Sequence, residues 1–189
     1  EARRHGADAV FVSALDQTAW LLNIRSRDVK YNPVATAFTY LGPEGNLLFI
    51  DRDKVGDDVA AYLASQGVQM RPYGSVKDFA ASLSTQRRVL LDPASTAYGI
   101  MEAFGDRAVE STSPLAMPKA CKNEVQIAGV REAMRRDGAA LVHAVMELER
   151  RFGAGEAITE MDVAEILLRH RSACLLYTSP SPRDYAASR

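Results

Sequence analysis

A long amphipathic helix is the feature of this sequence that most constrains its fold. Asn123 and Gln126 have the residue types and spacing of a capping box, which begins a helix, and Gly153 ends it. A helix over Glu124–Phe152 would be roughly 43 Å long. Its apolar residues recur every three, four or seven positions and form one stripe: Ile127, Val130, Met134, Leu141, Val145, Leu148 and Phe152. Such a helix needs a large partner surface, or its stripe stays exposed.

The chain ahead of this helix alternates between short apolar runs of strand length and helical segments. Pro43 and its neighbouring glycines join the second and third runs into an antiparallel hairpin, and Pro72 indicates an edge position for the fourth. Strands are expected at 7–12, 36–41, 46–50, 68–73, 88–91 and 107–110, with helices at 15–24, 54–65, 76–83 and 94–104. This alternation predicts an α/β domain over residues 1–112, built on a mixed sheet covered by helices.

Local motifs give more specific expectations within this domain. Trp20 lies in the apolar run AWLLNI, so we expect it to be buried against the sheet, with a cost of about 3–5 kcal/mol for Trp20→Ala. The prolines of residues 113–122 lack N–H groups, and this stretch is predicted to be a linker without regular helix. Three residue pairs have the pattern of a helix start: Ser13 with Asp16, Ser75 with Asp78, and Asp92 with Pro93.

The sequence changes character near its end. Thr159 and Asp162 form another capping box, which predicts a helix to about Arg171, so residues 123–172 are expected to begin a second domain. Residues 173–189 include LLYTSPSPRD and show no helical or strand period. This tail resembles sequencing-adapter or vector sequence translated through the end of a truncated read, and we expect it to be non-native. A flexible native tail is the alternative.

Composition limits the classes of function. The net charge of −1 argues against a dedicated nucleic-acid binder, which usually carries a basic surplus. No apolar run approaches the length of a membrane span, so no membrane partner is expected. The two cysteines, Cys121 and Cys174, lack metal-binding spacing and are expected to be reduced thiols of a cytoplasmic protein.

Residues suited to catalysis are scattered. His5, His143 and His170 each stand alone, and there is no glycine-rich phosphate loop, so no catalytic or metal-ligating residue is assigned. One polar loop, residues 25–34, lies between a buried helix and the hairpin, where binding residues are often found. Its candidates for the side facing a substrate are Arg25, Asp28, Tyr31 and Asn32. The alternative is that Arg25 and Asp28 form a local ion pair that only shapes the loop.

Three segments resemble the Xaa-Pro aminopeptidases (aminopeptidase P) of the creatinase group of metallopeptidases. VSALDQTAWLLNIRSRDVKYNPV, at 12–34, resembles their second domain. SPLAMPKACKNEVQIAGVREAMRRDGAALV, at 113–142, resembles the entry into their catalytic "pita-bread" domain, and ITEMDVAEILLRHRS, at 158–172, resembles its next helix. The chain departs from the family at Ser26, where glycine is common.

The resemblance implies a fold and an activity. The fold would be a creatinase-type, ribonuclease-H-like α/β domain over 1–112, with helices on both faces of a mixed sheet. A linker at 113–122 and a truncated start of the pita-bread domain at 123–172 would follow. Members remove the N-terminal residue from peptides whose second residue is proline, use two divalent metal ions, usually manganese, and commonly form homodimers. The family's ligands, two Asp, one His and two Glu, lie downstream of the helix that begins near Thr159.

The resemblance therefore implies that this chain lacks the metal site and is inactive alone. The apolar stripe of its long helix should be partly exposed and should promote association. Two alternatives use related folds: a non-catalytic binding or scaffold module, and a creatinase-like amidinohydrolase. The NPV loop and the 113–142 segment fit the aminopeptidases better.

Overall fold

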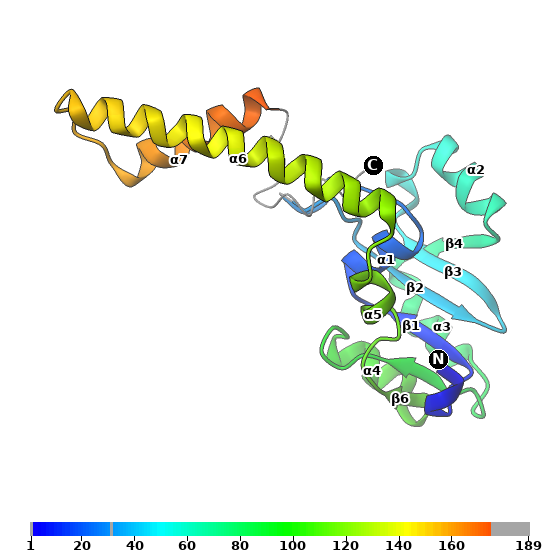
Figure 1. The fold of residues 1–189 in the computed structure, drawn as a ribbon. Helices are drawn as coiled ribbons and strands as arrows, with labels where there is room; N and C mark the ends of the chain where they lie inside the picture. Colours follow the sequence, from blue (N-terminus) through cyan, green and yellow to red (C-terminus); the bar gives the residue numbers. More distant parts are fainter. Residues whose placement is uncertain (1, 31, 175–189) are drawn as a thin grey trace. The chain divides into compact units, whose positions relative to one another are not determined.

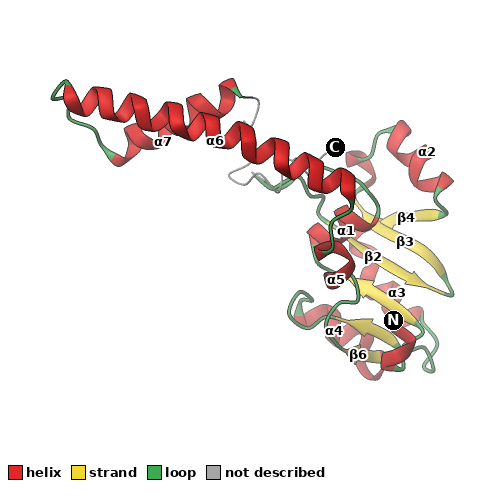
Figure 2. Ribbon diagram, viewed as in Figure 1, coloured by secondary structure: helices red, strands yellow, loops and turns green. Residues whose placement is uncertain are grey.

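A computed structural model describes residues 2–30 and 32–174 of the chain (Figures 1 and 2). The chain divides into two compact units, Glu1–Cys121 and a second unit from Lys122 onward, and each is described by itself. Tyr31 and, apart from its first two residues, the predicted non-native tail lie outside the described residues.

The first unit is built on a six-stranded mixed sheet (Figure 2). Its strand order is β4-β3-β2-β1-β5-β6, in which β2 pairs antiparallel with β1 and with β3 while all other neighbours are parallel. The predicted hairpin and the predicted edge position of the strand containing Pro72 are confirmed. The strands are β1 (Ala9–Val12), β2 (Ala37–Gly42), β3 (Gly45–Ile50), β4 (Val68–Pro72), β5 (Val89–Leu91) and β6 (Ala108–Glu110).

Helices cover both faces of this sheet, as predicted. Alternate residues of β3 enter two separate cores, Leu47 and Phe49 on one face and Leu48 and Ile50 on the other. Helices α3 and α4 close the first core, whereas α1 and α2 close the second. Their bounds are α1 (Leu15–Leu21), α2 (Asp57–Ser65), α3 (Val76–Ser82) and α4 (Tyr98–Phe104), with short 3₁₀ turns η1 (Ala2–His5), η2 (Arg52–Lys54), η3 (Tyr73–Ser75) and η4 (Gly105–Arg107).

Two of the predicted capping boxes are wrong because tertiary or local partners take the serine side chains. The N-cap of α1 is Ala14, and the Ser13 hydroxyl instead donates a buried hydrogen bond of 3.1 Å to the Thr96 hydroxyl. Ser75 occupies the N-cap position of α3, but its hydroxyl donates to the Pro72 carbonyl at 2.7 Å. A serine with the right spacing therefore does not cap when a better acceptor lies within reach.

Two helices begin later than predicted. The segment from residue 54 starts with the 3₁₀ turn η2, and α2 begins only at Asp57. The predicted start at Asp92 is a turn in which its carboxylate accepts the Ala94 N–H at 3.0 Å, and α4 begins at Tyr98. In both segments the chain makes a short turn after the strand and before the helix. The first turn is 3₁₀, and the second is closed by the Asp92 side chain.

Two further expectations for the first unit are corrected. Trp20 is half-buried rather than buried, because it lies on the last turn of α1 while Thr18 and Ala19 carry the buried face. The predicted linker contains a short helix, α5 (Ala116–Ala120). Pro118 is its third residue, and the missing N–H costs nothing there because the first-turn N–H groups have no intrahelical acceptor.

The second unit is a pair of helices, α6 (Glu124–Gly153) and α7 (Glu160–Ala173). Both predicted capping boxes are present, Asn123 with Gln126 and Thr159 with Asp162. The pair is fastened by an ion pair of Arg171 with Asp137 at 2.6 Å and by a hydrogen bond between His170 and Glu147 at 2.9 Å.

Small residues rather than large ones line the buried side of α6. Its buried residues are Ala133, Ala140 and Ala144, which share a side of the helix with Asp137 and Glu147 and therefore face α7. Much of the predicted apolar stripe stays exposed, with Met134 at 56% and Phe152 at 60% of their full surface. The expectation that the stripe is partly exposed is confirmed. Among the described helices, none is long and apolar enough to cross a membrane.

Candidate functional site

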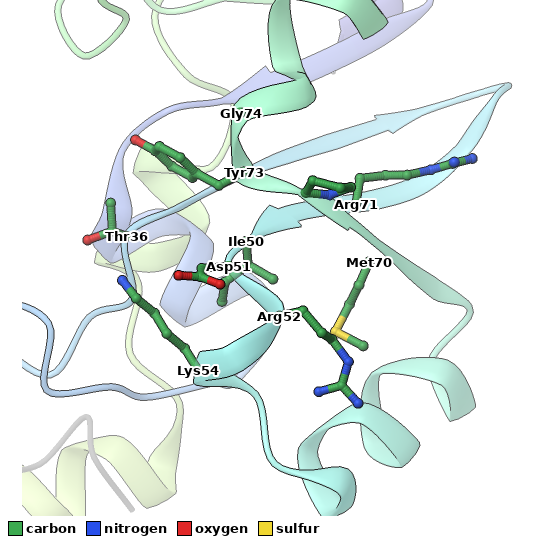
Figure 3. Close-up of a pocket in the computed structure, with 10 residues that line it drawn as sticks. Thr36, Ile50, Asp51, Arg52, Lys54, Met70, Arg71, Tyr73 and Gly74 are labelled. Carbon is green, nitrogen blue, oxygen red and sulfur yellow. The ribbon is translucent and has the colours of Figure 1, made fainter.

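A cavity of about 650 Å³ opens at one edge of the sheet in the first unit (Figure 3). It lies at the carboxyl ends of β3 and β4, whose last residues, Ile50 and Pro72, contribute to its wall. Its lining combines charged, hydroxyl and apolar groups: Thr36, Ile50, Asp51, Arg52, Lys54, Met70, Arg71, Pro72, Tyr73 and Gly74.

The strand connections explain why a cavity forms at this place. Strands β3 and β4 are parallel neighbours, so their carboxyl ends lie side by side. The chain leaves β3 toward α2 on one face of the sheet and leaves β4 toward α3 on the other face. Where two adjacent connections diverge to opposite faces, a crevice remains outside the strand ends, and this is the usual ligand position in open α/β sheets.

The predicted functional loop, residues 25–34, is joined to this cavity through Asp28. The Asp28 carboxylate accepts hydrogen bonds from the Lys54 ammonium at 2.8 Å, the Ser26 hydroxyl at 2.5 Å and the Thr36 N–H at 2.9 Å. Its side chain is only 13% exposed. The hydrogen bond from Lys54, together with those from Ser26 and Thr36, holds the pKa of Asp28 well below its usual value. Asp28 therefore stays ionised and fastens both ends of the loop.

The two other loop candidates that the structure describes, Arg25 and Asn32, make separate contacts. Arg25 donates to the carbonyls of Ala19 and Ile24 at 2.9 and 2.8 Å, and burial lowers the pKa of its guanidinium. The expected ion pair between Arg25 and Asp28 is wrong, because the ion pair of Asp28 is to Lys54. Asn32 is exposed, and its backbone closes a tight turn with Val29.

Sequence reasoning missed Asp51, Arg52, Lys54 and Tyr73 as lining residues of a site. A usable signal was present, because all four lie at or shortly after the ends of the strands predicted at 46–50 and 68–73. The carboxyl ends of parallel strands meet at one edge of a sheet. However, the sequence did not reveal that β3 and β4 are parallel neighbours.

The described residues do not fit a metal centre. Among residues 2–30 and 32–174, no three histidine, cysteine, aspartate or glutamate side chains converge where they could hold an ion. The rings of His143 and His170 stack at a centroid distance of 6.0 Å, and His170 is hydrogen-bonded to Glu147 at 2.9 Å. These contacts fasten α6 to α7.

The depressed pKa of Asp28 predicts an acid-sensitive contribution to stability. Because the pKa is lower in the folded state, this contribution is complete above the unfolded value of about 3.9 and is lost as pH falls through the folded value. Urea unfolding from about pH 7 down to about pH 2 should therefore show a smaller acid loss for Asp28→Asn than for the wild type. Asp58→Asn, at an exposed position of α2, is the control and should behave like the wild type. Equal acid sensitivity of Asp28→Asn and the wild type would contradict a stabilising role for the hydrogen bonds to the Asp28 carboxylate.

The fold and the site together define an α/β domain with a mixed sheet, a cavity at its strand ends and a capped helix pair following it. The chain belongs to the creatinase/prolidase N-terminal domain family, whose model matches residues 1–126. Similar curated proteins include a probable Xaa-Pro aminopeptidase P of Neosartorya fischeri, 37% identical over 172 residues, and the aminopeptidase P1 of Arabidopsis thaliana, 30% identical over 194 residues. These alignments cover 85% and 86% of this chain but 26% and 30% of the two relatives.

Solved structures show the same likeness. The X-prolyl aminopeptidase of Caenorhabditis elegans, described as a cytosolic enzyme with a di-nuclear active site, superposes with a TM-score of 0.84 at 31% identity. The match covers 90% of this chain and 29% of that one. The Xaa-Pro dipeptidase of Bacillus anthracis gives a TM-score of 0.68 at 10% identity, which is a likeness of fold alone. The chain thus spans between a quarter and a third of the length of these aminopeptidase relatives.

Proposed function

We propose that this chain is a fragment of a metal-dependent Xaa-Pro aminopeptidase, which releases the N-terminal residue from peptides whose second residue is proline. The observation that carries the proposal is the extent of the similarity. It runs through 85% of the chain at 37% identity to a probable Xaa-Pro aminopeptidase P, and so extends beyond the α/β unit into the helix pair.

Each part of the chain has a place in this proposal. Residues 1–112 form the second domain of the complete protein, 113–122 the linker, and 123–172 the start of the catalytic domain. The exposed apolar stripe on α6 supports this arrangement, since a catalytic sheet would bury it.

In this proposal the substrate contacts a loop of this chain, whereas the metal ions bind elsewhere in the complete protein. The loop bearing Arg25, Asp28, Tyr31 and Asn32 faces the peptide substrate, and its support is the rigid fastening of Asp28 to Lys54. Two divalent ions, manganese in the family, are held by residues outside this chain. When bound, these ions would supply Lewis-acid chemistry for activating a water molecule and polarising the scissile carbonyl. The complete protein is a cytoplasmic homodimer.

The test is an assay of the complete gene product, read from an uninterrupted coding sequence. Peptides with proline second should be cleaved on the order of a hundredfold faster than matched peptides with alanine second. Chelation should abolish the activity and Mn²⁺ should restore it. Binding of a proline peptide without cleavage would support a scaffold module instead, and hydrolysis of creatine would support an amidinohydrolase.

The 189-residue chain provides a second expected result. It should neither bind Mn²⁺ specifically nor cleave the proline peptide, because the proposed ligands lie elsewhere. Calorimetric titration with Mn²⁺ and the same peptide assay measure both properties. Metal-dependent turnover by this chain would show that the proposed division of roles is wrong.

A further inference from the structure

We propose that the cavity at the carboxyl ends of β3 and β4 binds a short apolar peptide with free termini. The inference rests on the cavity of this chain and does not depend on the proposed aminopeptidase activity. Its position, where the connections of two parallel strands diverge, is the position at which open α/β sheets bind ligands. Its volume of about 650 Å³ falls in the range of small-ligand sites.

One end of the cavity presents a carboxylate with an oxygen available to a ligand. Asp51 Oδ1 accepts the N–H of Asp53 at 3.2 Å, which fixes the side chain. For Asp51 Oδ2, no hydrogen-bond donor is found within the described part of the chain. Figure 3 shows the Asp51 carboxylate on the same side of the cavity as Thr36 and Lys54, below the ring of Tyr73. An ammonium group at this end would gain a charge-assisted hydrogen bond.

Lys54 also lies within electrostatic reach of Asp51, but its closest partner is Asp28, which matches its charge. Its ammonium forms the 2.8 Å ion pair with Asp28, whose carboxylate has three donors in all. The Asp51 carboxylate therefore remains the acidic group that faces the cavity at this end.

The opposite side of the cavity presents a guanidinium. Figure 3 shows the Arg52 side chain extending away from Asp51, toward Met70. One of its nitrogens donates to the Val55 carbonyl, which orients the group. Its contact with Asp57 is long, at 3.5 Å, and both side chains are exposed, so this pair competes weakly for a ligand. The remaining N–H groups of Arg52 suit a carboxylate.

Apolar groups form the wall between the two charged ends. Ile50 is buried, and Met70 and Pro72 extend the wall along the edge strand. The Tyr73 ring stacks on Phe38 at a centroid distance of 5.0 Å, so it is held in place as a flat contact surface. An acid and a base on opposite sides of an apolar wall match a peptide with an ammonium at one end, a carboxylate at the other and apolar side chains between them. A ligand of one charge would satisfy one end only.

The test uses the complete 189-residue chain and three forms of one dipeptide. The probes are valyl-leucine, its N-acetyl form, which lacks the ammonium, and its C-terminal amide, which lacks the carboxylate. In a titration followed by heteronuclear NMR, valyl-leucine should bind saturably and shift the signals of residues 50–54 and 70–74. Each blocked form should bind about tenfold more weakly, since each loses one charged hydrogen bond.

Two variants test which residue binds each end of the dipeptide. Arg52→Gln should weaken the free and N-acetyl dipeptides about tenfold and leave the amide unchanged, whereas Asp51→Asn should weaken the free dipeptide and the amide and leave the N-acetyl form unchanged. Arg135→Gln, on α6 in the other unit, is the control and should change none of the three.

The pattern across probes separates binding from folding damage. A variant that merely unfolds the first unit would weaken all three probes alike, and that result would overturn the proposal. It would equally be overturned by the absence of saturable binding of valyl-leucine, or by shifts located outside the cavity. A failed peptidase assay of the complete protein would leave these binding results intact.

Discussion

Replacing Phe104 with alanine should lower the free energy of unfolding of the first unit by about 3–5 kcal/mol. Phe104 is the last residue of α4, has no exposed surface and belongs to the core between the sheet and α3 and α4. Its ring meets that of Phe11 of β1 at a centroid distance of 5.1 Å. The truncation removes this aromatic contact and leaves a cavity that a sheet cannot collapse to fill.

Urea unfolding followed by fluorescence measures this effect, because Trp20, the one tryptophan of the sequence, lies in the same unit. The matched control is Tyr98→Ala at the other end of α4, where the side chain is 80% exposed and the change should stay within about 0.5 kcal/mol. A loss below about 1 kcal/mol for Phe104→Ala would contradict the described core. Trp20→Ala, at a half-buried position, should cost less than Phe104→Ala.

A single added methyl group at Gly42 should destabilise the same unit by about 1–3 kcal/mol. A Cβ atom there would lie 2.6 Å from Cζ of Tyr40 and 2.7 Å from Cβ of Ala9, both far inside normal contact. Neither neighbour can yield easily. Tyr40 is fully buried and its hydroxyl is hydrogen-bonded to Glu44, while Ala9 belongs to β1 in the middle of the sheet.

Thermal and urea unfolding of Gly42→Ala should therefore show a lower midpoint than the wild type. Gly74→Ala is the matched control in the same unit, since a Cβ at Gly74 meets no atom within 4 Å, and its change should stay within about 0.5 kcal/mol. Equal stability of the two variants would mean that β1 and β2 approach less closely than described.

The parts of the fold that could be predicted from the sequence are those set by local patterns. The Asn123 and Thr159 capping boxes, the hairpin turn and the edge strand all depend on residues close in sequence. Some of the predictions that were wrong depend on partners far along the chain. The Ser13 hydroxyl donates a hydrogen bond to Thr96, 83 positions away, and therefore does not cap the helix.

The same contrast between local patterns and distant partners applies to the candidate site. Its loop was identified from its polar residues, and Asp28 does have a structural role there. Its partner, Lys54, lies 26 positions away and is brought beside it by the β2–β3 hairpin, so the sequence suggested the nearer Arg25 instead. The cavity itself depends on the pairing of β3 with β4 and on the opposite directions in which the chain leaves them, and neither is encoded in a local motif.

The central place of β1 also sets an order of events during synthesis. Val10 pairs with Leu41 on one side and with Leu90 on the other. Of the six strands of this sheet, β1 is made first, so it can pair with β2 early, but its other edge stays open until β5 has been made. During that interval a buried, apolar strand lacks half of its backbone partners, and this is the stage at which the nascent chain is most exposed to wrong pairing with another strand. Once β5 and β6 have emerged, the sheet is complete before α6 has been made.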